Sequence, residues 1–261
     1  MISQPNPTQN RPAVIHNELA WHEQEAHRRI PLDAILYDPP AFDAVVQPAV
    51  AFLRPAAGEL VLDLGSGEGK ETLELASRGL IVVSVDLSFK QLCRARQFVQ
   101  ERLPQAQVYF VQANAEELPF ADRSFRRIYG KAVLHHLDLD LVAQTVERLL
   151  PPGGRATFAE PLARHPLIWL GRRLTPALRT RDEHPLPLNE LRCFAERFQR
   201  PALDTYYLLA PLAYLFRILP GSEWLFRKTH QWLHELDQWL LRHFRGLQNF
   251  AWYGVIKFHK L

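Results

Sequence analysis

The segment Val61–Gly69 (VLDLGSGEG) constrains the fold of this chain more than any other feature. A short apolar run ends at Gly65, Gly67 and Gly69, as expected for a buried strand that turns sharply into a helix. Glycines at such a turn let the backbone adopt positive φ and approach a bound ligand closely. The pattern therefore predicts a ligand site at the end of the first strand of an α/β sheet.

Single positions exclude two common phosphate-binding loops. The dinucleotide fingerprint Gly-x-Gly-x-x-Gly would need its third glycine where Lys70 stands. A phosphate loop needs a hydroxyl after its lysine, and Glu71 follows here. The carboxylates of Asp63 and Glu68 beside the loop would repel a pyrophosphate. The loop favours a ligand that carries a cationic amine or a sulfonium group.

Strands alternate with helices along most of the chain. Apolar and β-branched runs predict strands at 60–64, 80–85, 107–112, 127–133 and 155–159, and further strands near 203–209 and 250–258. Helical composition is found at 17–29, 41–53, 70–78, 90–103, 138–150 and 187–199, while 161–186 resembles a Pro- and Arg-rich connection. This alternation predicts a parallel sheet with helices on both faces.

Four of the predicted strands end at glycine or at a polar side chain. These residues are Gly65, Asp86, Asn114 and Glu160. Because ligands of open α/β sheets bind at the carboxyl ends of the strands, the four positions indicate one shared site.

These motifs resemble those of class I S-adenosylmethionine-dependent methyltransferases. Asp63-Leu64-Gly65-Ser66-Gly67-Glu68-Gly69 is similar to the first motif of the family, which holds the methionine part of S-adenosylmethionine. Asp86, followed by Leu87, stands where the family has the acid that binds both ribose hydroxyls. Asn114 and Ala115 correspond to the stretch that meets the adenine amine, although the family usually has Asp at the first of these positions. The amide oxygen of Asn114 can accept from that amine.

The fourth predicted strand carries another part of the resemblance. Gly130-Lys131-Ala132-Val133-Leu134-His135-His136-Leu137 is similar to the motif that lines the methyl-transfer site. Arg126 departs from the family, which usually opens this strand with Asp. The resemblance covers residues 55–160 firmly and 187–261 only in general layout.

The resemblance implies a fold, a cofactor and an activity. The fold would be a Rossmann-like doubly wound α/β sheet of about seven strands, mostly parallel with an antiparallel last strand, with helices on both faces and an aromatic-rich helical insertion before the last strand. S-adenosyl-L-methionine would be the cofactor of a methyltransferase similar to the small-molecule type 11 members.

A single domain is expected at 13–261 after a disordered tail at 1–12, with 161–186 and 210–248 as elaborations of the acceptor site. Cys93 and Cys193 form no metal-binding pair, and no metal site is expected.

A general base is needed if the acceptor is a hydroxyl group. His135 resembles the histidine of plant-type small-molecule O-methyltransferases, in which Asp follows directly, whereas here His136 precedes Asp138. The alternative is that both histidines only cap the helix at 138–150. Glu160 could orient the acceptor or belong to a structural turn, and His184 could belong to an acceptor loop or to a solvated one.

The acceptor is not identified by these motifs. Residues 1–150 carry a net charge of −4 and residues 151–261 a net charge of +7, and five of six tryptophans lie in the second part. The aromatic segment 206–252 could cover the site for a hydrophobic small molecule, contact a membrane peripherally, or pack as a helical layer on the sheet. Nucleic acid is disfavoured as an acceptor because the basic residues are dispersed among leucines. A protein of the same fold that binds the cofactor without transferring a methyl group is the other alternative.

Without a signal-peptide pattern or a long apolar run, a cytoplasmic location is expected, with membrane association as a variant, and the oligomeric state is left open.

Overall fold

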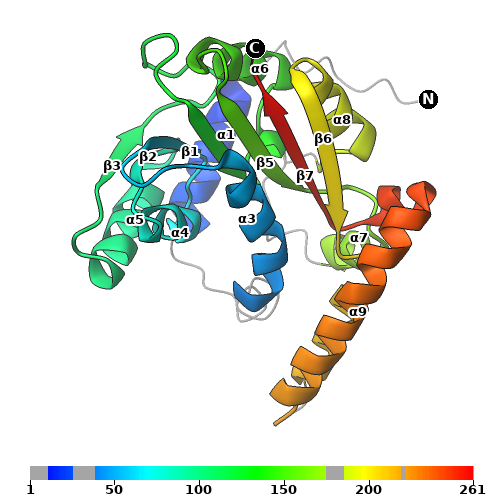
Figure 1. The fold of residues 1–261 in the computed structure, drawn as a ribbon. Coiled ribbons are helices and arrows are strands. Elements are labelled where there is room, and N and C mark those ends of the chain that lie inside the picture. Colours follow the sequence, from blue (N-terminus) through cyan, green and yellow to red (C-terminus); the bar gives the residue numbers. More distant parts are fainter. Residues whose placement is uncertain (1–10, 26–38, 175–184, 219–220, 261) are drawn as a thin grey trace.

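The computed structural model describes residues 11–25, 39–174, 185–218 and 221–260, and their centre is a seven-stranded sheet (Figure 1). The strands are β1 (Leu60–Leu64), β2 (Ile81–Asp86), β3 (Val108–Gln112), β4 (Arg127–Lys131), β5 (Arg155–Pro161), β6 (Gln199–Tyr206) and β7 (Tyr253–His259). Their order is β3-β2-β1-β4-β5-β7-β6. Neighbours from β3 to β5 are parallel, and β7 runs antiparallel to both β5 and β6. The predicted doubly wound sheet with an antiparallel last strand is confirmed.

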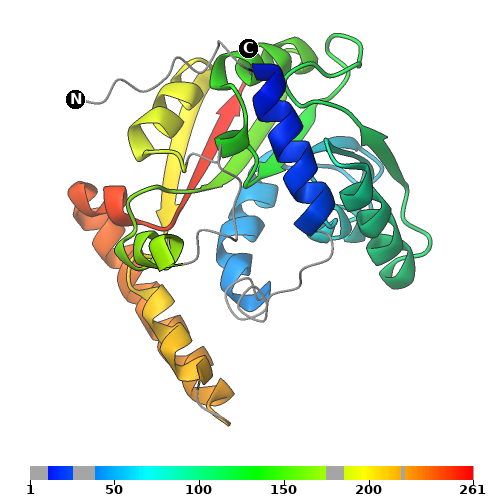
Figure 2. The same ribbon diagram turned by 180° about the vertical axis from the view of Figure 1, so that it is seen from behind.

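Helices cover both faces of the sheet (Figures 1 and 2). The helices α3 (Pro39–Leu53), α4 (Lys70–Ser77) and α5 (Phe89–Arg102) belong to one side, and α6 (Leu139–Leu149) and α8 (Leu188–Glu196) to the other. Successive side chains of β1 point to opposite faces, so Val61 packs in the cluster with α3 and Leu62 in the cluster with α6 and α8. Because every buried strand needs apolar side chains on both faces, the continuous apolar runs in the sequence are explained.

The first helix crosses the open end of the sheet. Helix α1 (Arg11–Glu25) lies in front of the strands in Figure 2 and contacts α5. The predicted disordered tail at 1–12 extends two residues too far, because Arg11 and Pro12 belong to α1. The side chain of Arg11 is held there by Glu116. Residues 1–10 lie outside the described part of the chain.

The described residues between β6 and β7 form an arm that extends away from the sheet (Figure 1). It contains a 3-10 segment η4 (Ala210–Ile218) and helix α9 (Glu223–His243), which pack along each other, and η5 (Arg245–Phe250) leads from α9 toward β7. Helix α7 (Pro166–Leu174) occupies part of the predicted connection 161–186. The prolines and arginines of residues 161–186 indicated a loop, so α7 was not predicted. Pro166 stands in the first turn of α7, where proline is tolerated. Within the described residues, no helix is both long and apolar enough to cross a membrane.

Candidate active site

A cavity of about 330 Å³ opens at the carboxyl ends of the strands. Its walls come from α1, the glycine loop after β1, the end of β2, and the segments that follow β3 and β4. Tyr253 also lines the cavity, because antiparallel β7 begins at the edge where the parallel strands end. The predicted convergence of strand ends is therefore found, and its volume suits a small-molecule site.

The glycine loop needs its glycines for three different reasons. Gly65 has a φ of 71°, and a Cβ there would lie 2.4 Å from Cγ2 of Val133. Gly69 has a φ of 82°, and its Cβ would lie 2.8 Å from Cβ of Ala95 on α5, so this glycine serves packing and does not line the cavity. Gly67 has a φ of 51° with open space around its Cβ position. Gly65, Ser66 and Gly67 all line the cavity, as predicted for a loop whose backbone contacts a ligand.

Asp86 lies at the end of β2 with its carboxylate fixed by two backbone amides. Its Oδ2 accepts from the N–H of Gly67 at 2.8 Å, and its Oδ1 accepts from the N–H of Ser88 at 2.9 Å. Asp86 and the adjacent Leu87 line the cavity. Each carboxylate oxygen has a further lone pair, so the group can accept additional hydrogen bonds from a ligand.

Asp63 does not line the cavity, although the first motif implied a role in cofactor binding. It is fully buried behind the loop, and its Oδ2 accepts from Oγ1 of Thr72 at 2.6 Å. Burial raises the pKa of Asp63 to about 7, against the opposing hydrogen bond from Thr72. The structure therefore gives Asp63 a role in holding β1 to α4, because position 63 points to the sheet face that α4 covers.

Gly130 also lies outside the cavity lining. A Cβ at this position would lie 2.6 Å from Cδ1 of Phe158 on β5, so the glycine permits close packing inside the sheet. Its neighbour Lys131 does line the cavity and forms an ion pair with Glu71, and Ala132, with a φ of 52°, follows at the turn. Of the predicted pair, only Lys131 can contact a ligand in this cavity.

Asn114 and Ala115 line the cavity after β3, as predicted. Oδ1 of Asn114 accepts from the N–H of Glu116 at 3.0 Å, which closes a local turn. This bond uses one lone pair of the amide oxygen and fixes the orientation of the side chain.

The rings of His135 and His136 lie side by side after β4, with centroids 4.1 Å apart, but they have different polar partners. Nδ1 of His135 lies 2.8 Å from Oε2 of fully buried Glu160, and neither residue lines the cavity. Oε1 of Glu160 accepts from the N–H groups of Val133 and Leu134, both at 2.9 Å. Glu160 and His135 therefore shape the turn from behind, and the predicted contact of these two residues with an acceptor is not found.

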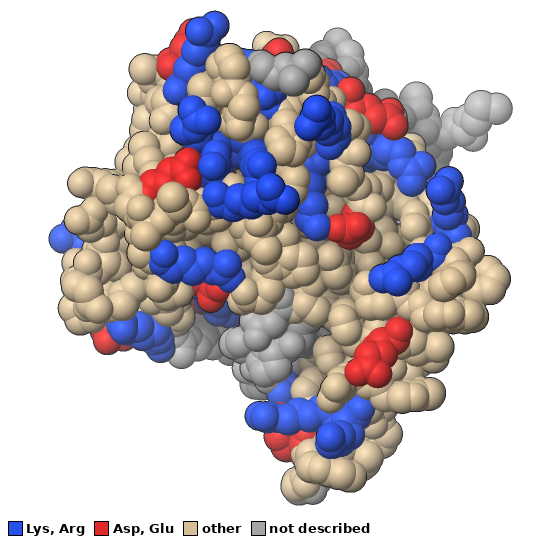
Figure 3. Space-filling model, in the orientation of Figure 1, with Lys and Arg blue, Asp and Glu red and all other residues tan. Residues whose placement is uncertain are grey.

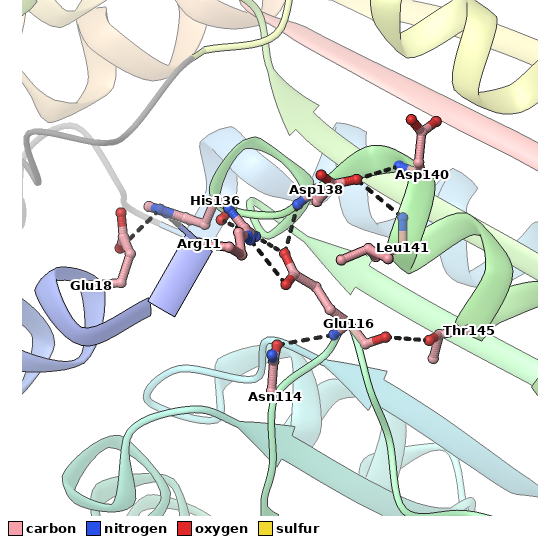
Figure 4. Close-up of polar contacts among 9 residues, drawn as sticks. All are labelled: Arg11, Glu18, Asn114, Glu116, His136, Asp138, Asp140, Leu141 and Thr145. Carbon is pink, nitrogen blue, oxygen red and sulfur yellow. Dashed lines mark hydrogen bonds and ion pairs between the residues drawn. The ribbon is translucent and has the colours of Figure 1, made fainter. Parts of the chain in front are cut away.

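His136 is the histidine that lines the cavity. Its Nδ1 lies 3.1 Å from Oε2 of Glu18 on α1 (Figure 4). This contact places a carboxylate of α1 beside one ring nitrogen of the histidine in the cavity wall.

Polar contacts hold α1 over the cavity. Nε of Arg11 donates to Oε2 of Glu116 at 3.0 Å, and Oε1 of Glu116 accepts from the N–H of Asp138 at 2.7 Å (Figure 4). At the other end of α1, Glu23 accepts from Oγ of Ser88 at 3.0 Å. Val14 and Ile15 lie between these contacts and line the cavity.

Neither these α1 residues nor Tyr253 were predicted as part of the site. The helix at 17–29 was expected, yet nothing in its composition indicated that it would cover the site. The segments expected to cover the site, 161–186 and 210–248, supply none of the residues that line the cavity in the described part of the chain. His184 lies outside the described residues.

Known proteins resemble this chain in sequence and in fold. Residues 62–158 match the family model described as a methyltransferase domain. An O-methyltransferase of Penicillium expansum, cnsE, is 36% identical over 116 residues, which is 44% of this chain and 42% of the relative. The match thus spans less than half the length of that relative.

Solved structures extend the similarity in fold over most of the chain. A phosphoethanolamine N-methyltransferase of Haemonchus contortus, solved with S-adenosyl-L-methionine, has a TM-score of 0.63 and 18% identity, covering 92% of this chain and 60% of its own. A geranyl diphosphate C-methyltransferase of Streptomyces coelicolor A3(2) has a TM-score of 0.62 and 16% identity, covering 98% of this chain and 100% of its own. At such low identity these likenesses concern the fold alone.

The match of residues 62–158 to the family model, together with the order of the sheet, identifies this part of the chain as a methyltransferase domain of Rossmann-like fold. The relatives and solved structures that resemble the chain support the class I S-adenosylmethionine-dependent methyltransferase family.

Proposed function

We propose that this protein transfers a methyl group from S-adenosyl-L-methionine to an apolar small molecule, with a hydroxyl oxygen as the preferred acceptor atom. The observation that carries the proposal is the joint placement of the Gly65–Gly67 backbone and the Asp86 carboxylate on one cavity wall. Solved structures of the same fold that contain S-adenosyl-L-methionine or S-adenosyl-L-homocysteine support the choice of cofactor.

The residues of the cavity fit this cofactor. The backbone at Gly67 stands beside open space, which leaves room for the methionine part along the loop. Asp86 would accept from the ribose hydroxyls, and Leu87 with Ala115 would contact the adenine ring. Acidic side chains along the cavity wall outnumber Lys and Arg by one, which favours a ligand that carries a positive charge; the acids are Glu18, Glu68, Glu71 and Asp86, and the bases Arg11, Lys70 and Lys131. When bound, the cofactor would supply an electrophilic methyl group on a sulfonium centre.

The protein's own part is alignment, exclusion of water and removal of a proton. Helix α1 would exclude water, because its apolar residues Val14 and Ile15 form part of the cavity wall. His136, held by Glu18, would take the proton of an acceptor hydroxyl as methyl transfer proceeds. This assigns the base to His136 instead of His135, since only His136 faces the cavity.

The acceptor is proposed to be apolar because of the wall beside His136. Val14, Ile15, Val133, Leu137 and Tyr253 line this region. Since small-molecule pockets are lined by apolar and aromatic side chains with few polar groups, a polyketide, quinone, lipid or decorated sugar fits better than a base in a nucleic acid.

Calorimetric titration with S-adenosylmethionine and S-adenosylhomocysteine tests the cofactor site. We expect micromolar binding, weakened by about 1–3 kcal/mol in the Asp86→Ala variant, which loses hydrogen bonds to a charged acceptor. Incubation with a labelled methyl donor and a panel of apolar hydroxyl compounds then tests the transfer. Absence of binding by the intact protein would overturn the proposal, and binding without transfer to any class of acceptor would favour a non-methylating protein on the same fold.

A further inference from the structure

Three tryptophans form a stripe along the outer side of α9. Trp224, Trp232 and Trp239 are 70%, 63% and 52% exposed. At 100° per residue, the three positions fall within an arc of about 80° on the helix surface. The opposite side of α9 carries the buried residues Phe226, Leu233, Asp237 and Leu241. The helix is therefore fully packed on its inner side and still apolar on its outer side.

Other large apolar side chains are exposed on the helical segments α7, η4 and α9. Leu225 on α9, Leu215 on η4 and Trp169 on α7 are exposed as well. Figure 3 shows that the surface of the arm, at the lower right, consists mostly of uncharged residues. An apolar surface that gathers on one projecting element marks a site of interaction, since single exposed apolar residues are otherwise scattered.

Positive charge accompanies the tryptophans. Lys228 and Glu235 fall within the arc of the stripe and Arg242 falls at its edge, and all three are exposed, so the stripe itself carries one more cation than anions. Across α7 and α9 the basic residues are Arg172, Arg173, Arg227, Lys228 and Arg242, and the exposed acids are Glu223 and Glu235. The outer surface of the arm thus combines tryptophan with an excess of cations.

We propose that the outer face of α9 docks on an anionic lipid surface, with its tryptophans in the headgroup region. Tryptophan suits that region because its ring is apolar and its N–H is polar, while lysine and arginine attract anionic headgroups. The inference does not depend on the proposed methyl transfer.

The base of the arm is fixed to the sheet, so docking would orient the whole molecule. Buried Asp237 accepts from the N–H groups of Leu208, Leu209 and Ala210 at 2.8, 2.8 and 3.0 Å, where the chain leaves β6. Nε2 of His165, just before α7, lies 3.0 Å from the carbonyl oxygen of Leu208. Helices α7 and α9 are therefore anchored at the same point beside the sheet.

Flotation of the full chain with lipid vesicles tests the docking. Vesicles of phosphatidylcholine alone are compared with vesicles that also contain phosphatidylglycerol, at low and at high salt. We expect binding to the anionic vesicles that weakens with salt, and a loss of about tenfold or more in the partition coefficient for the variant W224S/W232S/W239S. The matched control is Tyr109→Ser, which removes a 61% exposed aromatic side chain on β3, away from the arm, and should bind vesicles as the wild type does.

Two further variants make the test decisive. Trp224→Ser alone removes the most exposed ring of the stripe and should reduce binding without unfolding the arm, as circular dichroism would show. The pair Lys228→Gln and Arg242→Gln should abolish the preference for anionic vesicles. No binding to either vesicle, or full binding by the triple variant, would overturn the proposal. A dimer in sedimentation that the triple variant dissociates, without vesicle binding, would also overturn it and assign the stripe to a second copy.

Discussion

Oε2 of Glu18 lies 3.1 Å from Nδ1 of His136, so a residue of the first helix and a residue that follows the fourth strand meet across the mouth of the cavity. The ring of neighbouring His135 lies against that of His136, with centroids 4.1 Å apart, but its Nδ1 contacts buried Glu160. Two adjacent histidines of the same motif thus have different partners, one on the helix that borders the cavity and one in the core.

Alanine variants should distinguish the two histidines. His136→Ala is expected to lower kcat by about 10²-fold while leaving the affinity for S-adenosylhomocysteine nearly unchanged, because a general base is lost. His135→Ala should instead lower the free energy of unfolding by about 1–3 kcal/mol, because buried Glu160 loses a hydrogen-bond partner. Turnover kinetics and urea unfolding measure the two effects. The opposite pattern would return the role of base to His135.

The contact between Arg11 and Glu116 should stabilise α1 over the cavity. Arg11→Gln is expected to raise the Kd for S-adenosylhomocysteine by about tenfold or less, because the helix that closes the site is held less firmly. Faster hydrogen exchange in residues 11–25 would accompany this change. Arg78→Gln, on the far side of α4 in an exposed ion pair with Glu74, is the control that should alter neither measurement.

Alanine at two glycines of the loop should have different consequences. Gly65→Ala is expected to destabilise the protein by several kcal/mol, since its Cβ would clash with Val133 and its φ is positive. Gly67→Ala should cost only about 1–2 kcal/mol for the backbone strain, because its Cβ meets open space. Thermal unfolding compares the two variants. Equal losses of stability would show that the loop is packed differently from the structure.

Asp63 links stability to pH through its raised pKa. The folded-state pKa of about 7 lies above the unfolded value near 3.8, so the folded protein binds more protons between these limits. The contribution of Asp63 to stability is present in full below pH 3.8 and is lost as the pH rises through 7. Asp63→Asn, which cannot ionise, should gain stability relative to the wild type over this range, by on the order of 4 kcal/mol at pH 8. Urea unfolding at several pH values measures the difference, and a constant difference would contradict it.

His230 should make the protein less stable as the pH falls, whereas Asp63 makes it less stable as the pH rises. Burial, with a smaller effect of the positive charges of His234 and Arg217, lowers the pKa of His230 to about 4. Because the unfolded pKa is near 6.5, the unfolded protein binds more protons between pH 4 and 6.5, and stability falls as the pH drops through that window. His230→Phe, which suits the surrounding rings of Tyr207, Tyr214 and Phe226, should flatten this fall. An unchanged slope of unfolding free energy against pH would place the acid sensitivity elsewhere.

Sequence patterns predicted where the site lies better than they predicted which side chains reach it. Glycines or a carboxylate directly after an apolar run are typical of a strand end that borders a ligand. For this reason the sequence located the ends of β1 and β2 at the site, and Gly65 and Asp86 do line the cavity. Asp63 and Glu160 were misassigned because a strand end does not reveal which face its last side chains take. The contacts of Arg11 and Glu18 could not be predicted at all, since they join segments more than a hundred residues apart without any periodic signal.

That separation has a consequence for how the molecule is made. Arg11 meets a partner 105 residues further along the chain, and Glu18 meets one beyond the fourth strand. Contacts between such distant segments carry a large entropic cost of loop closure and form late in folding. On the ribosome, α1 emerges before the strands and lacks the surface that it docks on until the strands up to β4 have been synthesised. Helix α1 is therefore placed only after strands that are translated later, and the ligand cavity is completed only when α1 docks.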